Sequence, residues 1–198
     1  MKKTTQPKVA AKDSLHQLKI TLAWTNPEIW RRVVVPSGTT LDIFHQIIQA
    51  AMGWHSCHLY QFVAGKRPNL VYYGSSEFAE RGEMEDDSLV SIADLAPKAR
   101  SKFRYEYDFG DSWIHEILTE KILPPDPSIK HPVCLDGANA CPPEDCGGVG
   151  GFYNMVEALQ DPNHPEHDDF ADWIDEGWNP EVFDLNGVNA RLRRIRVS

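Results

Sequence analysis

The sequence predicts an α+β fold in which an antiparallel β-sheet occupies the N-terminal two-thirds of the chain. Two observations indicate this fold. Alternating apolar and polar residues, typical of half-buried strands, recur up to residue 123, and three helical apolar stripes follow after residue 150. A block of strands followed by a block of helices is typical of a sheet covered by helices. We therefore expect one early helix and three C-terminal helices to cover this sheet.

The chain opens with a predicted strand pair and the early helix. Leu18, Ile20 and Leu22 alternate with polar or small residues, and the run IWRRVVVP (29–36) follows an Asn-Pro turn signal. Two such runs across a short loop predict an antiparallel pair. Apolar residues then recur at helical spacing from Leu41 and stop at a glycine, which predicts an amphipathic helix.

Two further hairpins complete the predicted sheet. HLYQFVA (58–64) and NLVYYG (69–74) flank the turn sequence GKRP, and aromatic and β-branched residues beside a Gly/Pro turn predict a hairpin. KFRYEY (102–107) places its aromatic residues on one face, and WIHEILTEKIL (113–123) returns after the turn DFGD. A Pro-Pro pair ends this last strand.

The last third of the chain predicts three helices. Their apolar stripes are Phe152, Met155, Val156 and Leu159; Phe170, Trp173 and Ile174; and Leu185, Val188, Leu192 and Ile195. We predict a single domain over residues 14–198. Residues 1–13 lack periodicity and predict a disordered basic tail.

The formal net charge of −9 is concentrated in the second half of the chain. Residues 131–190 hold 13 acidic residues and no Lys or Arg. Because sequence-independent nucleic-acid binding needs clustered cations, we do not expect nucleic acid to be the main partner. No run approaches the roughly 18 apolar residues that cross a bilayer, and the N-terminus lacks the apolar centre of a signal peptide. We expect a cytoplasmic protein without a membrane partner.

Three of the four cysteines fall within CLDGANACPPEDC, with the spacing C-x6-C-x4-C. Cytoplasmic thiols stay reduced, so this cluster favours metal binding, reactivity or packing over a disulfide. Zinc sites usually pair cysteines two to four residues apart, and only the second gap reaches that limit. Cys134, Cys141 and Cys146 are therefore candidate zinc ligands, and packing or a disulfide or redox pair are the alternatives. The candidate fourth ligands are His131, His58 and His115.

The segment DFGDSWIHE gathers acidic residues and a histidine around a tight turn. Two carboxylates and an imidazole can bind a divalent ion or act as acid and base, so Asp108, Asp111 and His115 form a candidate site. If His115 shares the inward face of its strand with Trp113, its buried imidazole needs a partner. The alternative is a structural turn in which aspartate caps backbone amides. His58, just after the early helix, could reach the same site.

Four motifs in this order resemble the plasmid pRiA4b ORF-3-like family. They are IWRRVVVP, FHQIIQAAMGW with HLYQF, YEYDFGDSWIHEI and CLDGANACPPEDCGG, and the similarity runs from Leu15 to Leu192. The resemblance implies a single α+β domain, members mostly in bacteria and archaea, and frequent location near mobile elements. Some members carry a transposon-resolvase label, but no activity is established for the family. A recombinase needs arginines clustered around its nucleophile, and the sequence shows no such cluster.

Two positions depart from the family pattern. Tyr60 stands where many relatives have a second histidine, and Cys146 stands where relatives often have valine. The resemblance therefore implies that a shared site uses the remaining candidates, which are His58, Asp108, Asp111, His115, Cys134 and Cys141.

Three functional interpretations follow. The first is a binding or accessory module associated with mobile elements, without catalysis or a required cofactor, that recognises a protein or small-molecule ligand. The second is a zinc-dependent enzyme that uses His115 with Asp108 or Asp111. The third is a DNA-recombination accessory protein. All depend on one expectation, that the cysteine-containing connection lies beside the turn at Gly110. No pattern predicts an oligomeric state.

Overall fold

The computed structural model describes residues 13–175 and 177–197. In these ranges it forms an eight-stranded sheet with the order β5-β4-β3-β6-β7-β1-β2-β8. The strands are β1 (Leu15–Leu22), β2 (Trp30–Pro36), β3 (Tyr60–Lys66), β4 (Asn69–Gly74), β5 (Glu85–Asp86), β6 (Lys102–Tyr107), β7 (Trp113–Leu123) and β8 (Val133–Ala138). The helices are α1 (Leu41–Met52), α2 (Ser76–Glu80), α3 (Ile92–Leu95), α4 (Gly148–Gln160), α5 (His167–Trp173) and α6 (Leu185–Leu192), with a 3-10 turn η2 (Asp87–Leu89).

The strand pairs are antiparallel except for β5, which runs parallel to β4. The predicted α+β class is confirmed. Strand β1 lies between β7 and β2, and its inward residues Leu18, Ile20 and Leu22 are all buried. Period-two alternation therefore correctly predicted the inward face of this central strand, because a half-buried strand turns every second side chain to the core.

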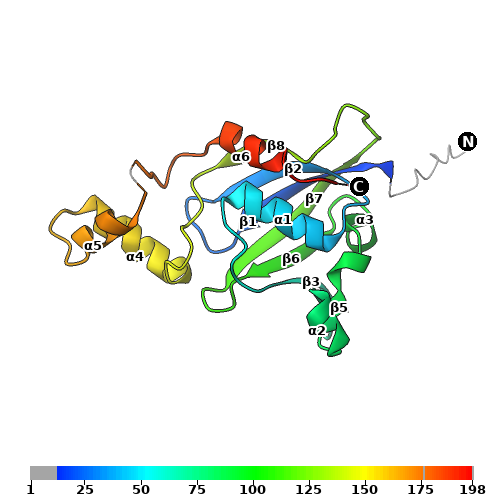
Figure 1. Cartoon of the computed structure of the whole chain (residues 1–198), viewed down its shortest axis with the longest axis horizontal. Helices are drawn as coiled ribbons and strands as arrows, with labels where there is room; N and C mark the ends of the chain where they lie inside the picture. The colour runs from blue at the N-terminus through cyan, green and yellow to red at the C-terminus, as the bar shows by residue number, and fades with distance from the viewer. Residues whose placement is uncertain (1–12, 176, 198) are drawn as a thin grey trace, which may run out of the picture.

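The helices are arranged unequally around the sheet. Helix α1 lies across one face and α6 lies beside it, near β8 (Figure 1). Helices α4 and α5 extend beyond the end of the sheet, which differs from the expected cover of three C-terminal helices (Figure 1). The reason is their narrow apolar surface: α4 buries Phe152 and Met155 in the core, whereas α5 has no buried residue.

The main core lies between α1 and the sheet. Phe44 of α1 contacts the rings of Phe62 and Phe103 at centroid distances of 6.0 and 6.1 Å. The opposite face of the sheet is polar. There Arg32 forms a 2.7 Å ion pair with Glu120. Alternation along β2 therefore turns Arg32 to the open face and its neighbour Arg31 to the helix-covered face, where it is 2% exposed.

The cysteine-containing segment begins with an edge strand, which the sequence did not predict. Strand β8 pairs with β2, and Val33 lies opposite Cys134. The outer edge of β8 is covered by α6. The Cys134 N–H donates to Asn189 Oδ1 over 2.9 Å, and Asn189 Nδ2 donates to the Cys134 carbonyl over 2.9 Å. One amide side chain thus satisfies two backbone groups that an edge strand would otherwise expose.

Two further predictions concern the ends and surroundings of the chain. The predicted tail, residues 1–13, lies outside the described residues except for Asp13. The assignment of residues 14–198 to one domain stays a prediction. Among the described helices, none has the length and apolar content that crossing a membrane requires.

Replacing Asn189 with alanine tests the cover over the β8 edge. We expect Asn189→Ala to lower the free energy of unfolding by about 1–2 kcal/mol, because two backbone groups lose their partners. Urea unfolding monitored by circular dichroism measures the change. Asn186→Ala, at an exposed position of the same helix, is the matched control and should change stability by less than about 0.5 kcal/mol. Equal effects of the two substitutions would contradict this role of Asn189.

Candidate functional site

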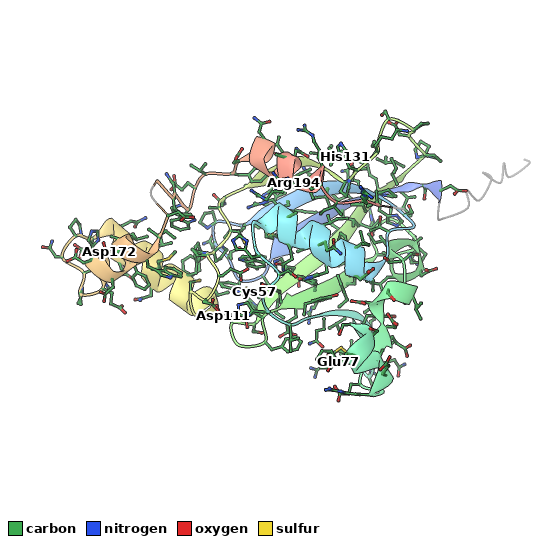
Figure 2. The ribbon with its side chains drawn as sticks, viewed as in Figure 1. Cys57, Glu77, Asp111, His131, Asp172 and Arg194 are labelled. Carbon is green, nitrogen blue, oxygen red and sulfur yellow. The ribbon has the colours of Figure 1, made fainter. Side chains whose placement is uncertain are left out.

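Three connections meet at the end of the sheet nearer α4. They are the segment after α1 (53–59), the β6–β7 turn (108–112) and the β8–α4 loop (139–147). Cys57 and Asp111, from the first two, are drawn at this end of the sheet (Figure 2). The N–H of Gly147 donates to Asp111 Oδ2 over 3.1 Å. The expectation that the cysteine-containing connection lies beside the turn at Gly110 is confirmed.

Trp54 joins the β8–α4 loop to the sheet. Gly53 ends α1 in the left-handed conformation, with φ 100°, and its N–H donates to the Gln49 carbonyl. The indole of Trp54 then turns inward and stacks on Tyr107 at a centroid distance of 5.0 Å. Its Nε1–H donates to the Pro142 carbonyl over 2.9 Å. Because this hydrogen bond is buried, Trp54 fixes the position of the loop.

Glycine permits the close approach of the loop to the β6–β7 turn. Gly148 has φ 67°, and a Cβ atom there would lie 2.7 Å from the Asp111 carbonyl oxygen. A larger residue would therefore clash with the turn as well as strain the backbone. The glycine-rich start of α4 serves contact with the turn, which explains a run of glycines that lacks the Lys and Ser/Thr of a phosphate loop.

The β6–β7 turn holds Asp108 with one carboxylate oxygen free. Asp108 has φ 55°, which aspartate tolerates better than most residues. Its N–H donates to the Leu59 carbonyl, and its Oδ1 accepts from the Gly110 N–H over 2.9 Å. The second oxygen, Oδ2, lies 3.8 Å from His58 Nε2. Asp108 therefore caps the turn, as the structural interpretation expected, and also faces the histidine.

Glu144 is positioned by two donors from the other connections. Its Oε1 accepts from the His55 backbone N–H over 2.8 Å and from the Tyr107 hydroxyl over 3.1 Å. Burial, a contact with Cys57 and the Glu144 charge raise the pKa of Tyr107 well above its usual value. Tyr107 therefore keeps its proton and remains a donor. The other oxygen of Glu144, Oε2, lies 3.9 Å from His58 Nε2.

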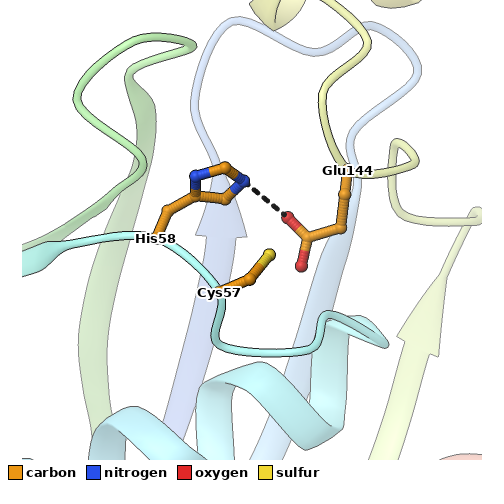
Figure 3. A group of neighbouring side chains, drawn as sticks. All are labelled: Cys57, His58 and Glu144. Atoms are coloured by element: carbon orange, nitrogen blue, oxygen red, sulfur yellow. Dashed lines mark ion pairs between the residues drawn. The ribbon is translucent and has the colours of Figure 1, made fainter.

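His58 lies at the centre of these carboxylates. Figure 3 shows His58 and Cys57, from the segment after α1, pointing toward Glu144 of the β8–α4 loop. His58 Nε2 lies 3.1 Å from Asp145 Oδ1, in addition to its contacts with Asp108 and Glu144. None of these contacts has hydrogen-bond geometry, and the buried Nε2 atom has no hydrogen-bond partner in the described part of the chain. Three carboxylates thus surround the Nε2 atom of His58.

The site concentrates negative charge. Two like charges 4 Å apart repel by about 1 kcal/mol in water and by about 4 kcal/mol at an effective dielectric constant near 20. Asp145 is largely exposed, so its repulsion of the other carboxylates is close to the value in water. The side chains of Asp108 and Glu144 are only 12% and 16% exposed, so their mutual repulsion is larger. A protonated His58 would balance one of the three carboxylates. Among the described residues, none of the three forms an ion pair with Lys or Arg.

The side chains at this position are of the types that can ligate a divalent cation. Two overlapping groups have all their ligand atoms within 4.8 Å of one another: Cys57, His58 and Glu144, and His58, Asp108 and Asp145. Imidazole nitrogen suits zinc, iron, nickel and copper, whereas carboxylate oxygen also suits manganese and magnesium. The exposed thiol of Cys57 would favour zinc over the harder ions. The shared ligand of both groups is His58.

The structure unites only part of the candidate site predicted from the sequence. His58 and Asp108 lie together, whereas Asp111 binds the Gly147 N–H through Oδ2 and belongs to neither group of neighbouring ligand atoms among the described residues. His115 shares the inward face of β7 with Trp113, as expected, and is fully buried. Its Nδ1 donates to the Trp113 carbonyl over 3.1 Å, and its Nε2 has no hydrogen-bond partner in the described residues. His115 therefore belongs to the core under Trp54, away from the carboxylates.

The three clustered cysteines do not form one group of ligands in the described part of the chain. All four cysteines of the protein are free thiols. Burial raises the pKa of Cys134 and Cys141 above the usual range and that of Cys146 to about 12. These three thiols therefore keep their protons at neutral pH. His131, a candidate fourth ligand, is drawn away from Cys57 (Figure 2).

Sequence reasoning missed Glu144, Asp145 and Cys57 as members of this site. Glu144 and Asp145 lie within the motif CPPEDC, but the cysteines on either side were predicted as the metal ligands instead. Cys57 precedes His58 directly, which was a usable signal. What the sequence lacked was the contact of Trp54 with Pro142, which brings the two segments together.

The buried histidines predict a loss of stability in weak acid. Burial lowers the pKa of His115 to about 3 and that of His45 to about 4. Between pH 6.5 and 4 the unfolded chain binds protons at these positions and the folded chain does not, so the free energy of unfolding falls as pH decreases. Each histidine contributes a slope of at most about 1.4 kcal/mol per pH unit.

Urea unfolding measured from pH 7 to 4 tests this dependence. His115→Leu should give a shallower decline than the unmodified protein, because one proton-binding site of the unfolded chain is removed. His55→Leu replaces an exposed histidine and should keep the original slope. An unchanged slope for His115→Leu would show that His115 titrates normally in the folded protein.

Comparisons with known proteins agree with this fold. The family model described as "Plasmid pRiA4b ORF-3-like protein" matches residues 14–187. "Uncharacterized protein y4hQ" of Sinorhizobium fredii (strain NBRC 101917 / NGR234) is 38% identical over 165 residues, which cover 81% of this chain and 80% of that protein. The crystal structure of the protein of unknown function MM3350 from Methanosarcina mazei Go1 is similar, with a TM-score of 0.78, 33% sequence identity, and coverage of 87% of this chain and 96% of that chain. The chain belongs to the plasmid pRiA4b ORF-3-like family.

Proposed function

We propose that this protein is a binding module for a divalent transition-metal ion, held at the end of the sheet by His58, Asp108, Glu144 and Asp145. The observation that carries the proposal is the environment of His58 Nε2. This buried nitrogen faces three carboxylates at 3.1 to 3.9 Å and has no hydrogen-bond partner in the described residues. A cation bound there would accept the nitrogen lone pair and neutralise the carboxylates together.

The surrounding bonds support a preorganised site. Asp108 and Glu144 each use one oxygen for hydrogen bonds with the protein and turn the other toward His58. Such bonds to ligating carboxylates orient them and raise metal affinity. The ligands come from three connections, so a bound ion would also link the β6–β7 turn to the β8–α4 loop. Zinc is the ion that one imidazole nitrogen and carboxylate oxygens, with the Cys57 thiol close by, favour most.

A metal-dependent enzyme is the second candidate function. A cleft of about 510 Å³ is lined by Glu144 and Asp145, by the end of α1 and by residues between Trp173 and Arg191. A metal ligated by these two residues would lie at the wall of a space large enough for a small molecule. This candidate uses His58 and Asp108 in place of the pairing of His115 with Asp108 or Asp111. The mobile-element association implied by the family resemblance remains a proposal for its cellular role.

Metal binding is tested by elemental analysis and isothermal titration calorimetry on protein purified without chelator. We expect about one zinc ion per chain, with manganese and magnesium binding more weakly. His58→Ala and Glu144→Gln should each weaken zinc binding tenfold or more, because each removes a ligand. Glu144→Gln keeps an oxygen that accepts the His55 and Tyr107 hydrogen bonds. Its loss of zinc affinity therefore measures the contribution of the negative charge of Glu144.

Matched controls separate ligand loss from unfolding or nonspecific binding. His164→Ala and Glu157→Gln remove the same side chains from exposed or half-exposed positions near α4 and α5. Both controls should bind zinc as the unmodified protein does. Stoichiometric zinc that survives in His58→Ala and Glu144→Gln, or disappears in Cys134→Ser, would contradict the proposed ligands.

A further inference from the structure

Arg31 is a buried cation on the helix-covered face of β2. It is 2% exposed and shares that face with Val33 and Val35, where an apolar residue would be ordinary. Burying a charge costs several kcal/mol unless the charge is compensated. An arginine at this position therefore needs a specific explanation.

The hydrogen bonds of Arg31 leave part of its guanidinium unused. Nε donates to the Ala51 carbonyl over 3.0 Å, and Nη1 donates to the carbonyls of Trp30 and Ala138 over 2.8 and 2.9 Å. These three bonds use three of the five N–H groups. In the described part of the chain, no bond uses Nη2, which leaves two donors free.

No carboxylate in the described ranges forms an ion pair with Arg31. The acidic groups that act electrostatically on Arg31 are the thiols of Cys141 and Cys134, and burial raises the pKa of both, so they stay neutral. The guanidinium lies 4.3 Å from the centre of the Phe183 ring, and the carbonyl end of α1 offers partial negative charge. These contacts compensate the charge incompletely.

Arg31 lines the same cleft of about 510 Å³ that borders the proposed metal site. The cleft lies between the end of α1, the β8–α4 loop and the segment that leads to α6. Its walls include the apolar rings of Trp54, Trp178 and Phe183. The Phe183 ring lies only 2.7 Å from the position that a Cβ atom of Gly137 would take. Glycine at 137 therefore allows Phe183 to pack beside the guanidinium.

A second arginine lines the cleft. The Nε of Arg191, on α6, donates to the Ala50 carbonyl over 2.8 Å. Both guanidinium groups are thus held by the last carbonyls of α1, and within the described ranges Arg191 also lacks an ion pair with a carboxylate. Two positive groups without acidic partners are unexpected in a chain of net charge −9.

We propose that this cleft binds a small organic anion, in which a carboxylate or phosphate group contacts Arg31 and Arg191 and an apolar or aromatic body contacts Trp54, Trp178 and Phe183. Guanidinium groups bind such oxyanions through charge-assisted hydrogen bonds. Here Arg31 is buried and Arg191 is exposed at the cleft, and the aromatic walls suit the remainder of the ligand. The proposal depends on Arg31 and Arg191 and holds whether or not a metal occupies the neighbouring site.

The acidic residues at the rim have other partners. Glu144 accepts hydrogen bonds from Tyr107 and His55, and Asp145 faces His58. Asp184 accepts the Gly187 N–H at the start of α6. Asp175 is the remaining acidic residue of the described lining. Because these carboxylates repel an anion, the charged group of a ligand must point toward Arg31 and Arg191.

Binding of three small probes tests the proposal in metal-free and zinc-loaded protein. The probes are phenylacetate, phenyl phosphate and the neutral analogue 2-phenylacetamide, followed by nuclear magnetic resonance shifts of the tryptophan indole N–H groups. We expect at least one anion to bind tenfold or more tightly than the amide and to shift the Trp54 and Trp178 signals. Comparison of the two anions identifies the preferred oxyanion.

Arginine variants provide the second arm. Arg191→Gln should weaken binding of the preferred anion about tenfold or more, the loss expected for a charge-assisted hydrogen bond. Arg194→Gln, three residues further along the chain and outside the cleft lining, is the matched control and should leave the affinity unchanged. Arg31→Lys keeps the charge but loses the free Nη2 donors, and should weaken binding while the protein stays folded by circular dichroism.

Two results would overturn the proposal. One is equal binding of the amide and both anions, which would show that the arginines do not contribute. The other is anion binding that Arg191→Gln leaves unchanged. Because the probes are titrated with and without zinc, failure here is distinguishable from failure of the proposed metal site, which is measured by zinc affinity alone.

Discussion

The contact of Trp54 with the β8–α4 loop is the interaction on which the functional end of this protein depends. The indole stacks on Tyr107 of the sheet, and its N–H holds the Pro142 carbonyl. Gly53 directs the ring inward by ending α1 in the left-handed conformation. With this contact in place, the His55 N–H and the Tyr107 hydroxyl can hold Glu144 beside His58, although residues 58 and 144 are far apart in the sequence.

This one anchor organises two chemically opposite sites. On one side of the loop, Glu144 and Asp145 join Asp108 around His58 and concentrate negative charge. On the other side, Arg31 and Arg191 are held by the carbonyl end of α1 and concentrate positive charge. The two sites share a wall, so a ligand with an anionic group and a metal-binding group could contact both. The separation of charge across a single loop is consistent with a binding module, and it gives the second candidate, a metal-dependent enzyme, a physical basis.

Local patterns predicted the sheet and its early helix well, because alternation and helical spacing report which side chains face the core. The inward position of His115 followed from the same rules. The candidate site grouped His58 and Asp108 with Asp111 and His115, and the structure brings only the first two together. Strand β8 was missed because VCLDGA has little β character and is held by β2 and Asn189. The places of α4 and α5 were missed because an apolar stripe does not reveal which surface it covers. The spacing of the cysteines led to their prediction as zinc ligands. The acidic residues between them, Glu144 and Asp145, lie near His58 because of tertiary contacts, which the spacing of residues in the sequence does not predict.

Anomalous X-ray diffraction at the zinc edge, from crystals grown with zinc chloride, would locate a metal bound beside His58. We expect a single strong peak within ligand distance of His58 Nε2, between the Asp108 and Glu144 oxygens that face it. A peak among Cys134, Cys141 and Cys146, or at His115, with none beside His58, would contradict it.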